Sequence, residues 1–202
     1  MWSMCYCALN VWETIGEINM HVLELAAAST QSARCADLAA ELNGHLYVDQ
    51  RGAKGLPFEA LLTVTTDTLT RIEQVADVGL YVICRRLIKP GDPKKIGLFP
   101  MVHHPDRTRD ECDAHWRDIH APLALVHHAH MTHYTQLSVV ETLRGEHFGG
   151  FALCGFESEE DIRERFYTNE ESIKVIADDV AKFADIKRSP RRLIATPTHS
   201  GS

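Results

Sequence analysis

Residues 108–123 read TRDECDAHWRDIHAPL and predict a capped helix that carries two histidines. Thr108, followed three residues later by Glu111, forms a capping box in which each side chain satisfies a backbone amide at the helix start. The apolar positions recur at helical spacing and form one stripe, made of Cys112, Trp116, Ile119 and Leu123. We therefore expect this helix to pack one face against a core.

The two histidines of this helix have different expected surroundings. His115 lies beside the apolar stripe, so we do not expect it on the solvent face. Pro122 lacks an amide hydrogen and is expected to end or bend the helix just after His120. A protonated imidazole at that C-terminal end would be favoured by the helix dipole.

The composition is typical of a folded protein and not of one that binds polyanions. The chain has 202 residues, 45% of them hydrophobic and 24% charged, enough for one ordinary domain or two small ones. The formal charge of −7 and the absence of a basic run argue against nucleic acid or an anionic membrane as partners. No stretch resembles a membrane span or a signal peptide, and six scattered cysteines show no disulfide framework. We expect a cytoplasmic protein with reduced cysteines.

The order of predicted elements repeats itself once along the chain. The first half predicts strand 2–11, helix 15–25 with a second helical piece up to 42, strands 46–49 and 58–65, a helix capped by Asp67 and closed by Gly79, and strand 80–88. The second half predicts strand 96–102, the helix already described, strands 134–143 and 148–156, a helical region from Ser158 to 184 that breaks at Thr168-Asn169, and strand 191–196.

A short sequence repeat supports a duplication. Arg-Arg-Leu-Ile occurs at 85–88 and again at 191–194, at equivalent ends of the two halves. Two βαββαβ units of this size suit the ferredoxin-like fold, whose sheet leaves one face free of helices. We predict an α+β fold with two tandem ferredoxin-like units packed sheet to sheet as an intrachain pseudo-dimeric α+β barrel. The units are 1–89, a degenerate repeat, and 96–202, joined by a linker over 90–95.

The second half, from Gly97 to Pro197, resembles the EthD-like family of dimeric α+β barrel proteins. The similarity rests on HWRDIHAPL at 115–123, VIADD at 175–179 and RRLI at 191–194. The first half keeps the element order but has no counterpart of the first motif. If the first half is a degenerate repeat, the resemblance implies that one chain mimics the family's usual dimer. It also implies a pocket between helices and sheet, and reactions like those of polyketide cyclases, anthrone decarboxylases, muconolactone isomerases or ether-degrading proteins, commonly without a metal or organic cofactor.

Such reactions need proton transfer, for which a histidine titrating near neutrality is suited. His115 is the first candidate; the alternative is a core histidine satisfied by backbone groups or Asp118. His103 and His104 follow a strand on opposite faces, so one of them can assist in the pocket. For His120 a structural role is favoured over a catalytic one.

The candidate binding residues lie on the helix and on the strand that follows it. Tyr134, Gln136 and Ser138 share one strand face and could stabilise an enolate oxygen, although an ordinary half-exposed face explains them nearly as well. Trp116, on the helix, is the fourth candidate binding residue. The arginines at the two strand ends, Arg85 and Arg86 with Arg191 and Arg192, could hold an acidic substrate, but exposed strand-end charges are the commoner explanation.

A group of histidines follows the helix, at positions 127, 128, 130 and 133. No carboxylate or cysteine lies at a spacing that would complete a metal site, so we expect a solvated connection and no metal. The leading hypothesis is a cofactor-independent lyase or cyclase acting on an aromatic or polyketide-like molecule. The alternatives are a non-catalytic small-molecule-binding or stress-responsive barrel protein and a haem-dependent oxygenase; a homo-oligomer is compatible with each.

Overall fold

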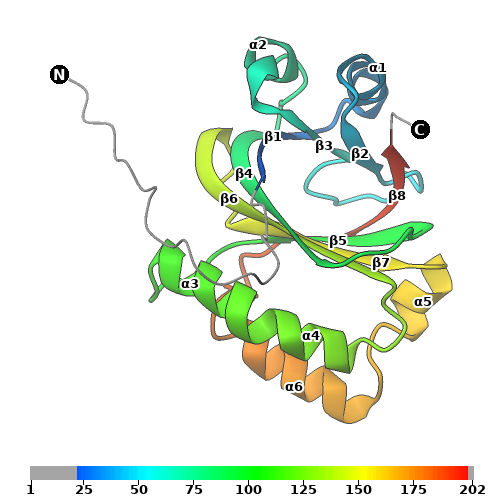
Figure 1. The fold of residues 1–202 in the computed structure, drawn as a ribbon, viewed down its shortest axis with the longest axis vertical. Helices are drawn as coiled ribbons and strands as arrows, with labels where there is room; N and C mark the ends of the chain where they lie inside the picture. Colours follow the sequence, from blue (N-terminus) through cyan, green and yellow to red (C-terminus); the bar gives the residue numbers. More distant parts are fainter. Residues whose placement is uncertain (1–21, 200–202) are drawn as a thin grey trace, which may run out of the picture.

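The strands of this chain close into one antiparallel barrel with helices on its outside (Figure 1). The computed structural model describes residues 22–199. The strand order around the barrel is β1-β3-β2-β8-β5-β7-β6-β4, and β4 pairs back onto β1. Closure leaves no strand edge free within the barrel.

In its described residues, the first half contributes four strands to the barrel and two helices on its outside. Its elements are β1 (Val22–Ser29), α1 (Ser32–Leu42), β2 (His45–Val48), β3 (Ala60–Thr65), the short 3-10 turn η1 (Thr66–Thr68), α2 (Leu69–Ile72) and β4 (Gly79–Lys89). Neighbouring strands run in the order β4-β1-β3-β2, which is that of a ferredoxin-like sheet.

The second half repeats this arrangement. Its elements are β5 (Lys95–Met101), α3 (Arg109–His115), the π-helical turn η2 (Trp116–His120), α4 (Ala121–His127), β6 (His133–Gly145), β7 (Gly150–Phe156), α5 (Glu159–Glu164), α6 (Glu170–Val180) and β8 (Leu193–His199). The order β8-β5-β7-β6 matches that of the first half, and the pairs β2–β8 and β4–β6 join the two sheets. The predicted intrachain α+β barrel is confirmed.

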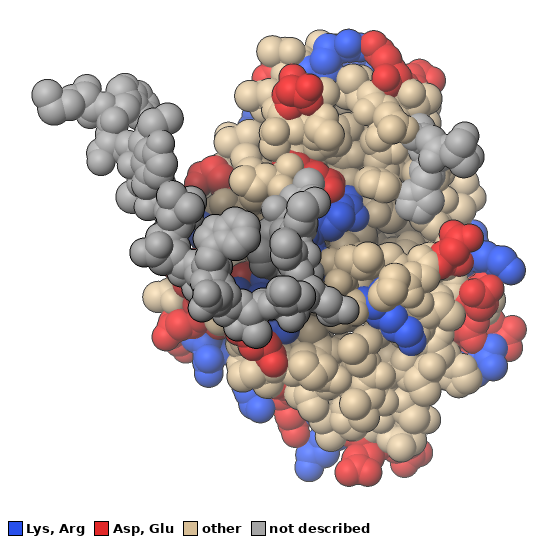
Figure 2. Space-filling view, in the orientation of Figure 1, with Lys and Arg blue, Asp and Glu red and all other residues tan. Residues whose placement is uncertain are grey.

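The helices form two separate layers on opposite sides of the barrel. Figure 1 shows α1 and α2 over one side, and α3 to α6 over the other. None of the described helices is long and apolar enough to cross a bilayer. Figure 2 shows acidic and basic side chains intermixed on the visible face, without a continuous basic patch.

The prediction of a helix over 15–25 is wrong where the structure describes it. Val22–Ser29 is strand β1, and three successive alanines, 26 to 28, are fully buried in it. One face of β1 looks into the barrel and the other lies under α1 and α2, so the sequence shows no alternation. Such a run cannot be distinguished from a buried helix by periodicity. The predicted strand 2–11 lies outside the described residues.

Two local predictions around α2 are also wrong. Thr68 rather than Asp67 precedes α2, and the Asp67 carboxylate instead accepts a hydrogen bond from Thr65 Oγ1 at 2.7 Å. Gly79 does not close a helix but opens β4. The helix ends at Ile72, earlier than the apolar spacing indicated, and Val75 lies in the following turn, where its amide donates to Ile72 O at 3.2 Å.

The barrel interior is an apolar core that contains a largely buried ion pair. Phe58, Tyr81 and Phe151 pack edge to face at its centre. Toward one end, Arg85 Nε lies 2.6 Å from Glu24 Oε1. Arg85 was expected to be an exposed strand-end charge, but β4 lies between β1 and β6, so its alternate side chains face the interior.

The other three arginines of the repeated motif also have structural contacts. Arg86, on the outer face of β4, is 3% exposed and forms a two-pronged ion pair with Asp113. Arg192 donates to Ile162 O, and its guanidinium lies 5.6 Å from the ring centroid of Phe99. Arg191 is exposed, as predicted, and donates to Lys54 O at 3.4 Å.

Candidate functional site

The helix begins at Thr108 as predicted, but it does not end just after His120. Thr108 Oγ1 accepts from the Glu111 amide at 3.2 Å, and Glu111 Oε2 accepts from the Thr108 amide at 2.8 Å. The chain then passes through η2, where the Ala121 amide donates to Trp116 O, five residues earlier. The π turn carries the helix past Pro122 into α4, so Pro122 bends the hydrogen-bond pattern without terminating the helix.

The extra residue in the π turn shifts by one position which of the later side chains face the core. Because η2 holds one extra residue, the buried face that begins with Cys112 and Trp116 continues through His120, Ala121, Ala124 and His128. Ile119, predicted in the apolar stripe, is instead 49% exposed. His120 lies in the middle of a continuing helix, so the expected contact with a helix C-terminus does not occur.

His115 and His120 converge on one buried carboxylate, that of Asp179 on α6. His115 Nε2 lies 2.9 Å from Asp179 Oδ1, and His120 Nδ1 lies 2.9 Å from Asp179 Oδ2. The Phe183 ring packs against both imidazoles, with centroid distances of 5.4 and 5.0 Å. The expected alternative partner, Asp118, is exposed and pairs with Arg117 instead.

This geometry fixes the protonation pattern of the cluster. A carboxylate accepts hydrogen bonds only, so the ring nitrogen that faces it carries the hydrogen. His120 then holds its lone pair on Nε2, which has no partner among the described residues. Burial lowers the pKa of His120 and outweighs the opposing effect of Asp179. Burial acts to raise the pKa of Asp179, but the hydrogen bonds from the two imidazoles hold it below its usual value.

A cavity of about 350 Å³ lies between α4, α6 and the outer face of the second half's sheet. Most of its wall is apolar or aromatic, including Phe99, Met101, Trp116, Phe166, Ile176 and Phe183. The polar side chains on this wall are those of His120, His128, Tyr134, Cys154, Tyr167 and Ser189. Apolar walls with a few convergent polar groups are typical of small-molecule sites.

Tyr134 accepts two hydrogen bonds, which leaves its hydroxyl hydrogen free to donate. Its oxygen accepts from Trp116 Nε1 and from Gln136 Nε2, both at 3.1 Å. Gln136 Nε2 also donates to Trp116 O at 2.9 Å, which fixes the orientation of the amide. The hydroxyl hydrogen of Tyr134 has no acceptor among the described residues. Because burial raises the pKa of Tyr134, this hydroxyl stays protonated.

The predicted site residues do not all reach this cavity. The structure brings Trp116, His120 and Tyr134 to its wall and places Gln136 behind Tyr134. His115 is held by Asp179 and does not line the cavity.

The remaining three predicted residues lie toward one end of the barrel. His103 and His104 line a separate hollow, and the backbone of His103 pairs with that of Ala184 beyond the end of β5. Ser138 Oγ donates to Asp113 Oδ1 at 2.5 Å and so supports the ion pair with Arg86.

Two functional candidates were missed by sequence reasoning. Asp179 lies within VIADD, a motif noted only for its resemblance, and its partners are 59 and 64 residues away. His128 was placed in a solvated connection but is 3% exposed, whereas His130 is exposed as expected. Within residues 22–199, no group of three histidine, cysteine or carboxylate side chains is arranged to hold a metal ion.

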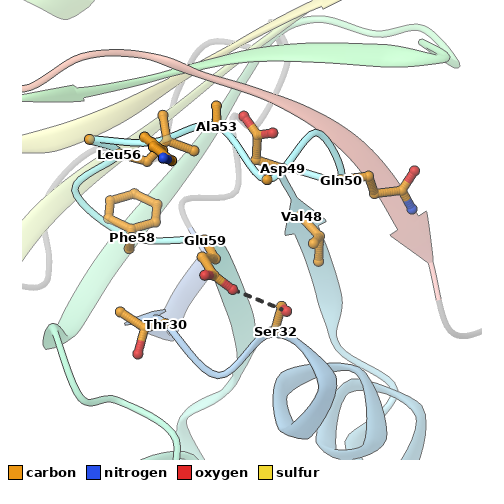
Figure 3. Close-up of a pocket in the computed structure, with 12 residues that line it drawn as sticks. Thr30, Ser32, Val48, Asp49, Gln50, Ala53, Leu56, Phe58 and Glu59 are labelled. Atoms are coloured by element: carbon orange, nitrogen blue, oxygen red, sulfur yellow. Dashed lines mark hydrogen bonds between the residues drawn. The ribbon is translucent and has the colours of Figure 1, made fainter.

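The first half carries a hollow of a different kind, shown in Figure 3. It measures about 660 Å³ and lies between the β2–β3 loop and the start of α1. Ser32 Oγ lies 3.4 Å from Glu59 Oε2 across it, and Asp49 is paired with Arg51. The space between the helices and sheet of this half is filled by a core cluster that includes Cys35, Leu38, Ile72 and Val75.

Comparison with known proteins extends the fold assignment. No protein-family model and no curated protein matches the chain. A crystal structure of an anthrone oxidase-like protein is similar, with a TM-score of 0.53 and 12% identity over 92% of this chain and 95% of that chain. A monooxygenase candidate from Lactobacillus acidophilus NCFM gives 0.49 and 8% over 89% and 96%. The first similarity supports the dimeric α+β barrel fold; membership of the EthD-like family stays a prediction.

Proposed function

We propose that this protein is an acid/base enzyme that removes a proton from an aromatic or polyketide-like molecule bound in the cavity beside α4 and α6. One observation carries the proposal: the Nδ1 atom of His120 is bound to buried Asp179, while the residue lines an apolar cavity. Each group that the proton transfer requires is supplied by the chain.

His120 is the proposed general base, in place of His115. Its Nε2 lone pair accepts the proton, and the imidazolium that forms is stabilised by Asp179 at 2.9 Å. Since burial lowers the pKa of His120, the ring is neutral before reaction at physiological pH. His115 and Lys182 Nζ, at 2.9 and 3.6 Å from Asp179 Oδ1, keep the carboxylate oriented and ionised.

Tyr134 is the proposed stabiliser of the enolate oxygen. Removing a proton next to a carbonyl group places negative charge on that oxygen, and a preorganised donor lowers the energy of this state. The two N–H groups that donate to Tyr134 polarise its hydroxyl and make it a stronger donor. Trp116 therefore acts both as a wall of the cavity and as part of this donor chain.

The fate of the enolate decides the reaction class. Cyclisation, dehydration and decarboxylation can all involve such a state, and the EthD-like motif favours this lyase or cyclase outcome. Analysing products with and without dioxygen separates this outcome from oxidation of the same enolate.

Hydrogen exchange at carbon tests the first step without knowledge of the product. The protein would be incubated in D₂O with a panel of aromatic ketones and anthrones, and deuterium incorporation followed by mass spectrometry. We expect His120→Asn, which keeps a donor toward Asp179 but lacks Nε2, to lower the exchange rate by roughly a hundredfold or more. We expect Tyr134→Phe to cost a similar factor.

The matched control is His127→Asn, because His127 binds Ser172 and does not line the cavity. Exchange that is catalysed by the unmodified protein and is unchanged in His120→Asn would contradict the assigned base.

A second candidate function is ligand binding without chemistry. The sharing of Asp179 by two imidazoles also links α3 and η2 to α6, which is a structural role by itself. This alternative predicts ligand binding in the cavity with no exchange at carbon. The haem-dependent alternative is tested by the visible absorption spectrum of the purified protein after addition of haemin.

A further inference from the structure

His128 is a second histidine on the cavity wall, and its ring is fixed on one side. Its Nδ1 lies 2.7 Å from the carbonyl oxygen of Phe166, which can only accept, so Nδ1 carries the hydrogen. The ring packs against Phe166 and Tyr167, with centroid distances of 4.4 and 5.3 Å. These contacts hold one tautomer and one orientation.

The other ring nitrogen, Nε2, therefore carries a lone pair that can accept a hydrogen bond. Nε2 has no partner among the described residues, and the residue lines a largely apolar cavity. No carboxylate contacts His128 within the described part of the chain, in contrast to His120, which has Asp179 behind it. Nε2 of His128 is thus a neutral acceptor and not a base.

We infer that His128 selects ligands that carry a phenolic hydroxyl, whose hydrogen Nε2 accepts inside the cavity. The inference rests on the proposed use of this cavity as the ligand site. A buried acceptor that a ligand leaves unpaired costs free energy, so the site disfavours an analogue that lacks the hydrogen. Tyr134 supplies the complementary donor, so the favoured class has a phenolic hydroxyl and a carbonyl oxygen on one small aromatic framework.

Naphthol and its methyl ether are a matched pair of probes for this role. Both are apolar aromatic molecules with one oxygen, but only naphthol can donate. Calorimetric or fluorescence titration would give the dissociation constant of each probe. We expect the preference for naphthol over the ether to be about fivefold larger in the unmodified protein than in His128→Asn.

His128→Asn is chosen because its amide can still donate to the Phe166 carbonyl while Nε2 is lost. His127→Asn is the control and should keep the full preference. His128→Gln is a second variant that keeps a polar group near the position of Nε2, and is used if the first does not fold.

The outcomes separate this inference from the proposed function. A preference that disappears in His128→Asn supports the inference even if no substrate exchanges hydrogen at carbon. Equal preference in both proteins, or no binding of either probe to the unmodified protein, overturns it, even where His120-dependent exchange is observed.

Discussion

Acidification should destabilise this protein through His128, and the size of the effect follows from its burial. The His128 ring is 3% exposed, and burial lowers its pKa from the usual 6.5 to about 4. The unfolded chain therefore binds a proton at this residue between those two pH values, while the folded protein does not. Stability from this source is complete above pH 6.5 and is lost as the pH falls toward 4.

The magnitude is set by the difference between the two pKa values. The full shift corresponds to roughly 3 kcal/mol in the free energy of unfolding, reached once the pH lies below 4. Between pH 7 and pH 5 the loss attributable to His128 is about 2 kcal/mol. The contribution from His120 changes over the same range but is common to a variant that alters His128 alone.

Urea denaturation at pH 7 and pH 5 provides the measurement. The unmodified protein should lose about 2 kcal/mol more between these pH values than His128→Asn, because asparagine does not titrate. His127→Asn should behave like the unmodified protein. Equal losses in the unmodified protein and His128→Asn would refute the assignment of a buried, neutral His128.

Two further predictions concern packing around Trp116. Arg86→Met should lower the free energy of unfolding by roughly 3 kcal/mol, because it leaves the half-buried Asp113 carboxylate without its two-pronged partner. Urea denaturation would measure this loss. The control is Arg117→Met, at a more exposed arginine, which should change the free energy of unfolding by less than about 1 kcal/mol. Comparable losses in both variants would argue against a special role for Arg86. Gly150→Ala should cost roughly 1–3 kcal/mol, since its Cβ would lie 2.6 Å from Trp116 Cζ3 and 2.9 Å from a β6 carbonyl oxygen; an unchanged melting temperature would contradict that contact.

The sequence by itself determined the elements whose signals are local. The Thr108–Glu111 capping box is present, Ser158 Oγ accepts from the Asp161 amide, and Asn169 caps α6 at the predicted break. These features depend on residues three positions apart, so neighbouring chemistry suffices to predict them. The repeated element order then predicted the barrel, because two sheets that each have one face without helices can bury those two faces against each other.

Tertiary structure decided what depends on distant contacts. Strand β1 forms because it is covered on both faces, which overrides the helical spacing read from the sequence. The sequence motif identified the helix that carries both His115 and His120. Only the π turn, the packing of α6 against that helix and the position of buried Asp179 decide that His120, ahead of His115, lines the cavity. Partners separated by about sixty residues leave no periodic signal in a single sequence, so the geometry of the candidate site emerged only from the fold.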